Sequence, residues 1–329
     1  MPAIASKITG LGAYIPPKVL TNFDLEKMVD TTDEWIQTRT GIRERHIVEP
    51  GTPTSDLALE AGKQAIKNAG LKPSDIELII VATITPDMSF PSTACVVQNK
   101  LGATNAGAFD MAAACSGFPY AVTVADGMIR GGLYKHVLVI GAEVLSPFID
   151  WKDRGTCILF GDGAGAAVLS ATTQKNHGII ATYLGSDGSA GDILKIPAGG
   201  SAIPPSTQSV NDRLHTVKMS GSEIFKIAVR TMGDAAVEVC RRAKIQFDEI
   251  DCLIPHQANF RIIQAMAERL EMPLSKIYLN LDKYGNMSAA STAVALYEAV
   301  EAGFVKPGSN VILVAFGGGL TWAACAIKW

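Results

Sequence analysis

Cys115, His256 and Asn286 are side chains whose types and settings point to acyl-transfer chemistry. Cys115 lies in segment 108–117, whose small residues predict a short buried strand that turns sharply into an apolar helix. A thiol at a helix N-terminus meets unpaired N–H groups and the positive end of the helix dipole. These groups are expected to lower the thiol pKa and to hold an oxyanion on an attached ester. An inert buried cysteine is the alternative.

His256 and Asn286 are candidate hydrogen-bond donors to such an oxyanion. His256 follows an apolar strand predicted at 251–255 and opens a helix predicted at 257–270. Ligand sites form at strand ends in α/β sheets, and a helix N-terminus disfavours imidazolium, so a neutral His256 is expected. Asn286 stands in a loop just before another small-residue helix, where its amide can supply a second donor. A helix cap and a turn asparagine are the alternatives for these two residues.

The elements that must position these side chains alternate between strands and helices, as in α/β proteins. Continuous apolar runs at 78–83 and 137–141 predict strands that are buried on both faces of a sheet. Residues 185–218 are rich in Gly, Ser and Pro and predict an irregular excursion that covers a site. The predicted helices span 55–69, 91–101, 118–129, 222–243 and 288–303.

An internal repeat relates the two halves of the chain. The segments FGDG at 160–163 and FGGG at 316–319 are each followed by a strand-like run of small residues. The repeat predicts two βαβ-type halves, residues 1–172 and 173–329, related by a pseudo-two-fold axis. The first segment also fits G-x-G-x-x-A, but a predicted strand follows it where a dinucleotide fingerprint must open a helix. A dinucleotide site is therefore rejected.

Composition excludes several classes of function. The chain has 329 residues and a net charge of −3, so no basic excess is available for a nucleic-acid partner. Six dispersed cysteines without a C-x-x-C pair predict neither zinc nor disulfides, and indicate a reduced, cytoplasmic setting. No apolar run approaches the ~20 residues of a membrane span. The N-terminus lacks the apolar core of a signal peptide.

Three motifs carry a resemblance to a known family. AAACSG at 112–117, PHQAN at 255–259 and GNMSAA at 285–290 are similar to the Cys, His and Asn motifs of β-ketoacyl-acyl carrier protein synthase III. The similarity extends over the chain, through TRTGIRER at 38–45, DRGT at 153–156 and FGGG at 316–319. In the related elongating synthases the corresponding set is Cys-His-His, and thiolases have a second active cysteine. Asn286 separates this chain from both.

The resemblance implies a thiolase-like fold, layered α/β/α/β/α, and a condensing enzyme that initiates fatty-acid biosynthesis. Cys115 would take an acyl group from a coenzyme A primer, acetyl-coenzyme A, with the backbone N–H groups of Cys115 and Gly318 as the oxyanion hole. His256 and Asn286 would then stabilise the enolate formed when malonyl-acyl carrier protein loses carbon dioxide. The resemblance implies no metal and no cofactor, since coenzyme A enters as a thioester substrate.

The resemblance also implies binding residues. Trp35 and its neighbouring guanidinium groups could by themselves stack an adenine, although an amphipathic helix with surface ion pairs is the alternative. The coenzyme A set comprises Thr31, Trp35, Arg39, Arg154, Gly221, Phe225 and Asn259. The carrier-protein set comprises Lys226, Gln257, Ala258, Asn259, Phe260, Arg261 and Arg269. Phe90 would close the acyl pocket of the neighbouring subunit in a homodimer. Ser222 stands where family members often have Asn, which puts one tunnel hydrogen bond in doubt.

Primer length is left open by the sequence. A related thiolase-fold enzyme that uses other acyl groups on the same three residues is the alternative function.

Overall fold

The protein is built on two β-sheets, seen in a computed structural model that describes residues 4–174 and 177–329. The first sheet has five strands in the order β1-β7-β6-β4-β5. Its strands are β1 (Ala5–Tyr14), β4 (Leu78–Ala82), β5 (Gly107–Met111), β6 (His136–Glu143) and β7 (Gly163–Thr172). Strands β4, β5 and β6 are parallel, whereas β7 runs antiparallel to both β6 and β1. Parallel strands β4 and β6 are almost wholly buried, as their unbroken apolar runs predict.

The second sheet repeats this pattern with four strands in the order β11-β12-β13-β8. Its strands are β8 (Gly178–Ser186), β11 (Cys252–Pro255), β12 (Asn310–Gly317) and β13 (Thr321–Lys328). Strands β11 and β12 are parallel, and β13 is antiparallel to β12 and to β8. A single parallel bridge between Leu253 and Ile277 stands where the first sheet has its fifth strand.

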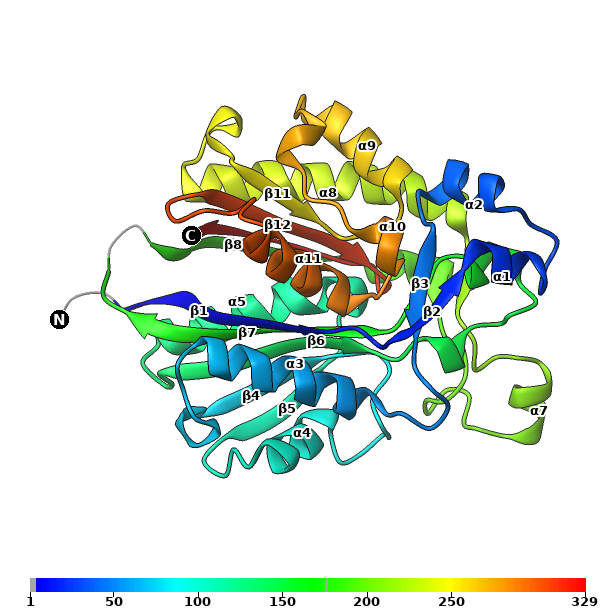
Figure 1. The fold of residues 1–329 in the computed structure, drawn as a ribbon, viewed down its shortest axis with the longest axis horizontal. Coiled ribbons are helices and arrows are strands. Elements are labelled where there is room, and N and C mark those ends of the chain that lie inside the picture. The colour runs from blue at the N-terminus through cyan, green and yellow to red at the C-terminus, as the bar shows by residue number, and fades with distance from the viewer. Residues whose placement is uncertain (1–3, 175–176) are drawn as a thin grey trace.

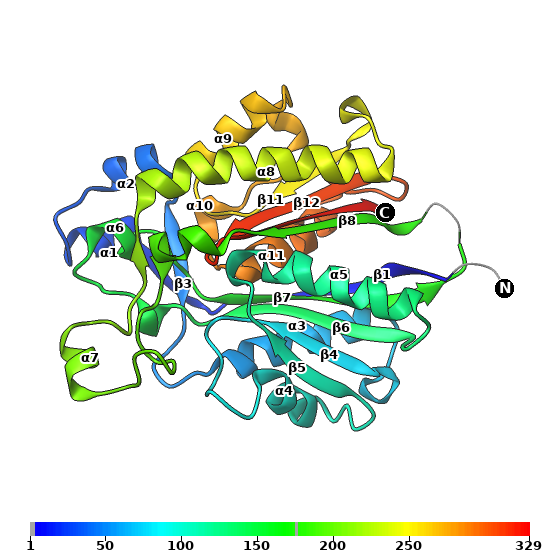
Figure 2. The same ribbon diagram turned by 180° about the vertical axis from the view of Figure 1, so that it is seen from behind.

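The helices and sheets form five layers, α/β/α/β/α (Figures 1 and 2). Helices α5 (Gly117–Arg130) and α11 (Ala289–Glu301) lie between the sheets. Helices α3 (Thr54–Asn68) and α4 (Thr93–Leu101) cover the first sheet, and α8 (Gly221–Ala243) and α9 (Phe260–Arg269) cover the second. The short helices are α1 (Asn22–Glu26), α2 (Asp33–Thr40), α6 (Arg154–Cys157), α7 (Thr207–Asn211) and α10 (Leu281–Tyr284). The layered α/β class expected from the sequence is confirmed.

The predicted internal repeat corresponds to the strand order of the two sheets. FGDG leads into β7 and FGGG leads into β13, and each of these strands pairs with an edge strand of its sheet, β7 with β1 and β13 with β8. The first segment opens into strand β7 and not into a helix, which agrees with the rejection of a dinucleotide fingerprint. The boundary between residues 172 and 173 stays a prediction, and it falls between the end of β7 and the start of β8.

The central helices approach the sheets closely because their contact residues are small. A Cβ atom at Gly141 of β6 would lie 2.4 Å from the carbonyl oxygen of Ala289. A Cβ atom at Gly165 of β7 would lie 2.6 Å from the Ala293 side chain. Interiors are packed so tightly that one added methyl group must displace its neighbours. These alanine and glycine residues thus set the spacing between α11 and the first sheet.

Some predicted boundaries differ from the structure. The helix predicted at 257–270 begins only at Phe260, because Asn259 adopts an extended backbone and caps it. The helix predicted from residue 91 begins at Thr93, since Ser92 is its N-cap. The excursion at 185–218 is mostly irregular, but it contains α7 and a small two-stranded sheet of β9 (Leu194–Lys195) and β10 (Lys218–Met219). A second two-stranded sheet pairs β2 (Lys18–Thr21) with β3 (Glu44–Ile47).

Candidate active site

Cys115 lies in a single 3-10 turn, η2 (Ala114–Ser116), between the end of β5 and the first residue of α5. The second half of the chain holds this turn in place. The hydroxyl of Thr321 in β13 donates a hydrogen bond to the carbonyl oxygen of Ala113 at 2.9 Å. The backbone carbonyl oxygen of Thr321 accepts a hydrogen bond from the Ser116 hydroxyl at 3.0 Å. Both ends of the turn are therefore fixed to the opposite sheet.

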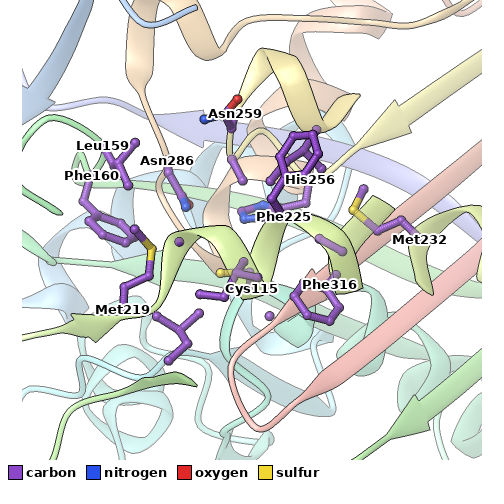
Figure 3. Close-up of a pocket in the computed structure, with 17 residues that line it drawn as sticks. Cys115, Leu159, Phe160, Met219, Phe225, Met232, His256, Asn259, Asn286 and Phe316 are labelled. Carbon is purple, nitrogen blue, oxygen red and sulfur yellow. The ribbon is translucent and has the colours of Figure 1, made fainter. Parts of the chain in front are cut away.

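The three side chains predicted to act together line one cavity. Cys115, His256 and Asn286 come from η2, from the end of β11 and from the loop before α11. All three are nearly buried, with exposed fractions of 7%, 3% and 7%. Figure 3 shows the imidazole and the amide pointing toward the space in front of the sulfur.

Asn286 is oriented by its own loop. Its Oδ1 accepts the backbone N–H of Ser288 at 2.8 Å, which leaves the amide nitrogen as the group that faces the cavity. Its backbone N–H bonds to the carbonyl oxygen of Leu159, and its carbonyl oxygen accepts from Gly161. An amide held in this way presents donors without any rearrangement.

His256 is neutral, but not for the reason expected from the sequence. It lies four residues before α9 begins, so the expectation that it opens that helix is wrong. Burial instead lowers the pKa of His256 to about 3. Its backbone N–H bonds to the carbonyl oxygen of Val314, which fixes it to the edge of the second sheet. A neutral imidazole can donate one N–H bond to an anion in the cavity.

The pKa shift of the Cys115 thiol is opposite in sign to the shift expected from the sequence. Burial raises the pKa of Cys115 to about 12, and the negative charge of buried Glu143 adds to the effect. Only the hydroxyl of Ser288 and a backbone N–H act in the opposite direction. The expectation of a lowered pKa is therefore wrong for the resting state, because desolvation outweighs the helix terminus.

Gly318 reaches Cys115 from the end of β12. It lines a second cavity together with Cys115, Ala113 and Ser288, whereas His256 lines only the first. Its neighbour Gly317 packs against the nucleophile, since a Cβ atom there would lie 2.6 Å from the Cys115 nitrogen. The backbone at Gly317 therefore lies directly against the backbone of Cys115.

Most of the expected coenzyme A residues lie in two places, along the central cavity and around Trp35. Gly221, Phe225 and Asn259 line the cavity that holds the three central side chains. Trp35 stacks directly on Arg154, whose guanidinium carbon is 4.8 Å from the ring centroid, and Arg39 lies 5.5 Å from the same ring. Thr31 has a buried hydroxyl without a partner among the described residues. Because Trp35 and Arg154 already touch, an adenine between them requires Arg154 to move.

The expected carrier-protein residues fall into two groups. Lys226, Arg261 and Arg269 are exposed, although Arg269 is already paired with Asp234 at 2.6 Å. Ala258, Asn259 and Phe260 are half-buried. Gln257 is fully buried, and its amide bonds to the backbone of Pro255, Tyr278 and Asn280. Its expected place on a docking surface is therefore wrong, since its polar atoms hold the site loop together.

Phe90, expected at a subunit boundary, is 85% exposed. Strand β5 forms the edge of the first sheet, where Gly107 is exposed and residues 108–111 are half-buried.

Three residues near the sulfur were not anticipated from the sequence: Gly317, Ser288 and Glu143. Gly317 and Ser288 stand inside motifs already singled out, so the motif letters were a signal for them. Glu143 lies two residues beyond the strand predicted at 137–141 and ends the observed β6, and strand ends are the places to look for site residues.

Metal-binding and membrane-spanning features were also searched within residues 4–174 and 177–329. No group of three or more His, Cys, Asp or Glu side chains there could hold a metal ion. No helix among them is both long and apolar enough to cross a bilayer.

Comparisons with known proteins agree with this geometry. Residues 109–188 match the family model described as 3-oxoacyl-[acyl-carrier-protein (ACP)] synthase III, and residues 240–329 match the model of its C-terminal part. A β-ketoacyl-[acyl-carrier-protein] synthase III from Caldanaerobacter subterraneus is 57% identical over 99% of this chain and 98% of its own. A protein of that name from Clostridioides difficile is 55% identical, over 98% of each chain.

The chain belongs to the β-ketoacyl-acyl carrier protein synthase III family. It is an acyltransferase of the condensing type that initiates fatty-acid biosynthesis. Solved synthase III structures show the same thiolase-like fold. The enzyme from Aquifex aeolicus is similar with a TM-score of 0.92 and 48% identity, covering 98% of this chain and 100% of its own. A priming β-ketosynthase of the R1128 polyketide pathway has a TM-score of 0.91 at 35% identity, covering 98% of this chain and 96% of its own.

Proposed function

We propose that this synthase III condenses an acyl-coenzyme A primer, acetyl-coenzyme A among the substrates, with malonyl-acyl carrier protein through an acyl-Cys115 intermediate. The observation that carries the proposal is that Cys115, His256 and Asn286 line one buried cavity. A sulfur supplies the nucleophile and two neutral donors supply anion stabilisation.

In the first half-reaction, the sulfur of Cys115 attacks the primer thioester. The backbone N–H groups of Cys115 and Gly318 hold the oxyanion until coenzyme A leaves. In the second half-reaction, malonyl-acyl carrier protein loses carbon dioxide, and His256 and Asn286 donate hydrogen bonds to the thioester enolate. The carbanion then attacks acyl-Cys115 and releases a β-ketoacyl-acyl carrier protein. Decarboxylation supplies the carbanion, so the proposal needs no metal and no cofactor.

The path from the surface to the sulfur is assigned to the pantetheine arm. Phe225 and Asn259 line it, and the guanidinium carbon of Arg261 lies 5.7 Å from the Phe225 ring centroid at its mouth. The exposed cations Lys226 and Arg261 are proposed to receive the acidic carrier protein. Trp35, Arg39, Arg154 and Thr31 are proposed to hold the nucleotide end of coenzyme A.

A homodimer is proposed through the free edge of β5. An exposed Phe90 and half-buried apolar residues on an edge strand favour a protein partner over solvent. In this assembly the partner subunit's Phe90 would close the acyl cavity, which is open on one side in the single chain. The cytoplasmic location expected from the cysteines agrees with all six being free thiols, and it too is part of the proposal.

The decisive experiment is to incubate the protein with radiolabelled acetyl-coenzyme A and then add malonyl-acyl carrier protein. We expect label on Cys115 and then a four-carbon product on the carrier protein, and we expect Cys115→Ser to take up no label. Absence of label with every acyl-coenzyme A tested would refute the proposal.

A condensing enzyme for longer or branched primers is the second candidate. The cavity beside Gly318 has a volume of about 330 Å³, roughly twice that of an engineered cavity that admits benzene. The structural similarity to a priming β-ketosynthase of a polyketide pathway also shows that this architecture is not confined to one pathway. A scan of primers of graded length and branching separates the two candidates, because labelling by longer or branched primers alone would favour the second.

A further inference from the structure

The two proposed enolate donors come from separate segments of the chain. His256 follows β11 and Asn286 precedes α11, so the spacing of their side chains depends on the contacts that join these segments. Two donors stabilise one small anion only when both are aimed at it at the same time. A misplacement of about 1 Å can cost about 10²-fold in rate. Residues that join the two segments therefore bear on the reaction even where they do not touch the substrate.

Gln257 joins the segment of His256 to the segment before α10. Its side chain is fully buried. Its Nε2 donates to the carbonyl oxygen of Pro255 at 2.8 Å and to that of Tyr278 at 3.1 Å. Its Oε1 accepts the backbone N–H of Asn280 at 3.1 Å. Both N–H groups and the oxygen are thereby used, so this side chain cannot turn without losing a buried hydrogen bond.

Glu298 of α11 continues this connection, because its half-buried carboxylate holds both ends of α10. Asn280 is the N-cap of α10, and its Nδ2 donates to Oε2 of Glu298 at 2.9 Å. Tyr284 is the last residue of α10, and its hydroxyl donates to Oε1 of the same carboxylate at 2.5 Å. Burial and the hydrogen bond to Glu298 raise the pKa of Tyr284, so its phenol stays protonated and remains the donor.

Asn286 follows Tyr284 by two residues, across a stretch of backbone that is tightly packed. Gly285 lies between them with a φ of 64°, and a Cβ atom there would lie 2.7 Å from the carbonyl oxygen of Leu159. The backbone N–H of Asn286 donates to that same oxygen at 2.8 Å, and the N–H of Gly161 donates to the carbonyl oxygen of Asn286 at 3.0 Å. A shift of Tyr284 is therefore passed on to Asn286 rather than absorbed between them.

We propose that a chain of hydrogen bonds, which we call the donor clamp, positions His256 and Asn286 relative to each other for enolate stabilisation. The donor clamp consists of Gln257, Asn280, Tyr284 and Glu298. The proposal rests on the proposed function, in which His256 and Asn286 donate to the enolate. None of the four clamp residues is among those that line the cavity of the sulfur, so they act through the two donors as positioning residues.

The donor clamp predicts unequal effects on the two half-reactions. Decarboxylation needs both side-chain donors at once, whereas acylation uses the sulfur of Cys115 and backbone N–H groups. Loosening the clamp should therefore slow carbon dioxide release from malonyl-acyl carrier protein and leave acyl transfer to Cys115 nearly unchanged. A merely structural role would instead lower stability and slow both half-reactions alike.

The test measures carbon dioxide release and label transfer from acetyl-coenzyme A in wild type, Glu298→Leu and Tyr284→Phe. We expect Glu298→Leu to lower kcat for decarboxylation about tenfold or more and label transfer by less than about twofold. Tyr284→Phe loses one of the two bonds to the carboxylate and should give a smaller loss in the same half-reaction. Tyr297→Phe is the matched control, because this neighbour on α11 instead accepts a hydrogen bond from Gln64 of α3 at 2.8 Å. It should retain both wild-type rates.

The Glu298→Gln variant separates the position of this side chain from its charge. The carbonyl oxygen of a glutamine can accept the Tyr284 hydroxyl. Its N–H₂ group can donate to Oδ1 of Asn280, which is buried and has no hydrogen-bond partner among the described residues. We therefore expect Glu298→Gln to retain most of the wild-type decarboxylation rate. A loss as large as that of Glu298→Leu would show that the charge matters, and would overturn the donor clamp.

A double-mutant cycle tests whether the donor clamp acts through Asn286. In an Asn286→Ala background, Glu298→Leu should cost about twofold at most, because the spacing of two donors no longer matters once one is absent. The full tenfold loss in that background, or equal slowing of both half-reactions in Glu298→Leu, would overturn the proposal. If Glu298→Leu does not fold, Tyr284→Phe against Tyr297→Phe carries the same comparison. A wild type that neither takes up label nor releases carbon dioxide would instead refute the proposed function.

Discussion

Asn286 and His256 are both proposed to donate to the enolate, and the surroundings of each suit that task. Asn286 uses its oxygen internally and so presents its N–H₂ group. His256 is kept uncharged by burial and so presents an N–H rather than a competing cation. Both therefore suit an anion that exists only briefly, since neither attracts a permanent counter-ion.

Substituting Asn286 by Ala should separate the two half-reactions. Loss of one donor to the enolate should slow decarboxylation of malonyl-acyl carrier protein by about 10²–10³-fold. Acyl transfer from acetyl-coenzyme A to Cys115 should fall far less. Carbon dioxide release and label uptake, measured on the same preparation, check this, and decarboxylation at the parent rate would remove the assigned role.

The pKa of His256 also predicts how stability depends on pH. The unfolded histidine titrates near its ordinary value of 6.5, whereas the folded one titrates at about 3. Between those values the unfolded chain binds the extra proton, so stability present above pH 6.5 is lost as pH falls, by about 1.4 kcal/mol per pH unit. We expect His256→Gln to have a shallower pH dependence of unfolding free energy between pH 6 and 4, measured by urea titration. An unchanged slope would show that the imidazole is not held neutral.

At the scale of elements, the site depends on the end of β12 lying against η2. Only glycine fits at 317, because any Cβ atom would meet the backbone nitrogen of Cys115. This contact joins residues that are about two hundred positions apart in the chain, so the sequence shows the glycines but not what they touch.

The Gly317→Ala variant should displace the nucleophile. Overpacking at this contact is expected to lower the free energy of unfolding by about 1–3 kcal/mol and to slow Cys115 acylation. Gly127→Ala on α5 is the control, since no atom lies within 4 Å of its added Cβ and alanine favours a helix. Thermal unfolding and label uptake measure both effects, and equal behaviour of the two variants would contradict the contact.

The sequence predicted the elements well where periodicity or apolar runs were long, as in β4, β6 and α8. It also placed Cys115, His256 and Asn286 at element ends, where side chains from different elements can meet. It failed where the outcome depends on burial. The sign of the Cys115 pKa shift and the buried position of Gln257 both depend on neighbours from distant segments.

At the scale of the whole molecule, the cavity is lined by residues of α8 and α9, and both helices carry exposed cations, Lys226 and Arg261. Figure 2 shows these two helices over the second sheet. Arg261→Glu should raise the KM for malonyl-acyl carrier protein about tenfold, because a charge reversal at a polar rim mainly weakens encounter. Acylation by acetyl-coenzyme A should change much less. Steady-state kinetics at low and high salt check this, with Lys63→Glu on the distant helix α3 as the control; equal effects of both variants would contradict a docking surface at Arg261.

Phe90 provides a prediction about assembly. If the partner subunit's Phe90 closes the acyl cavity, Phe90→Ala should shift kcat/KM toward longer or branched primers by about tenfold or more. The primer scan described above measures this, together with the solution mass of the chain. A monomeric wild type, or an unchanged primer preference, would contradict the proposed closure.

The unequal number of strands in the two sheets has a further consequence. The second sheet replaces a fifth strand by the single bridge at Ile277, so the two halves do not offer matching free edges. Two chains that join through β5 by a two-fold axis use up that edge in both copies. Self-association of this kind is self-limiting: it stops at a pair and gives no open-ended polymer.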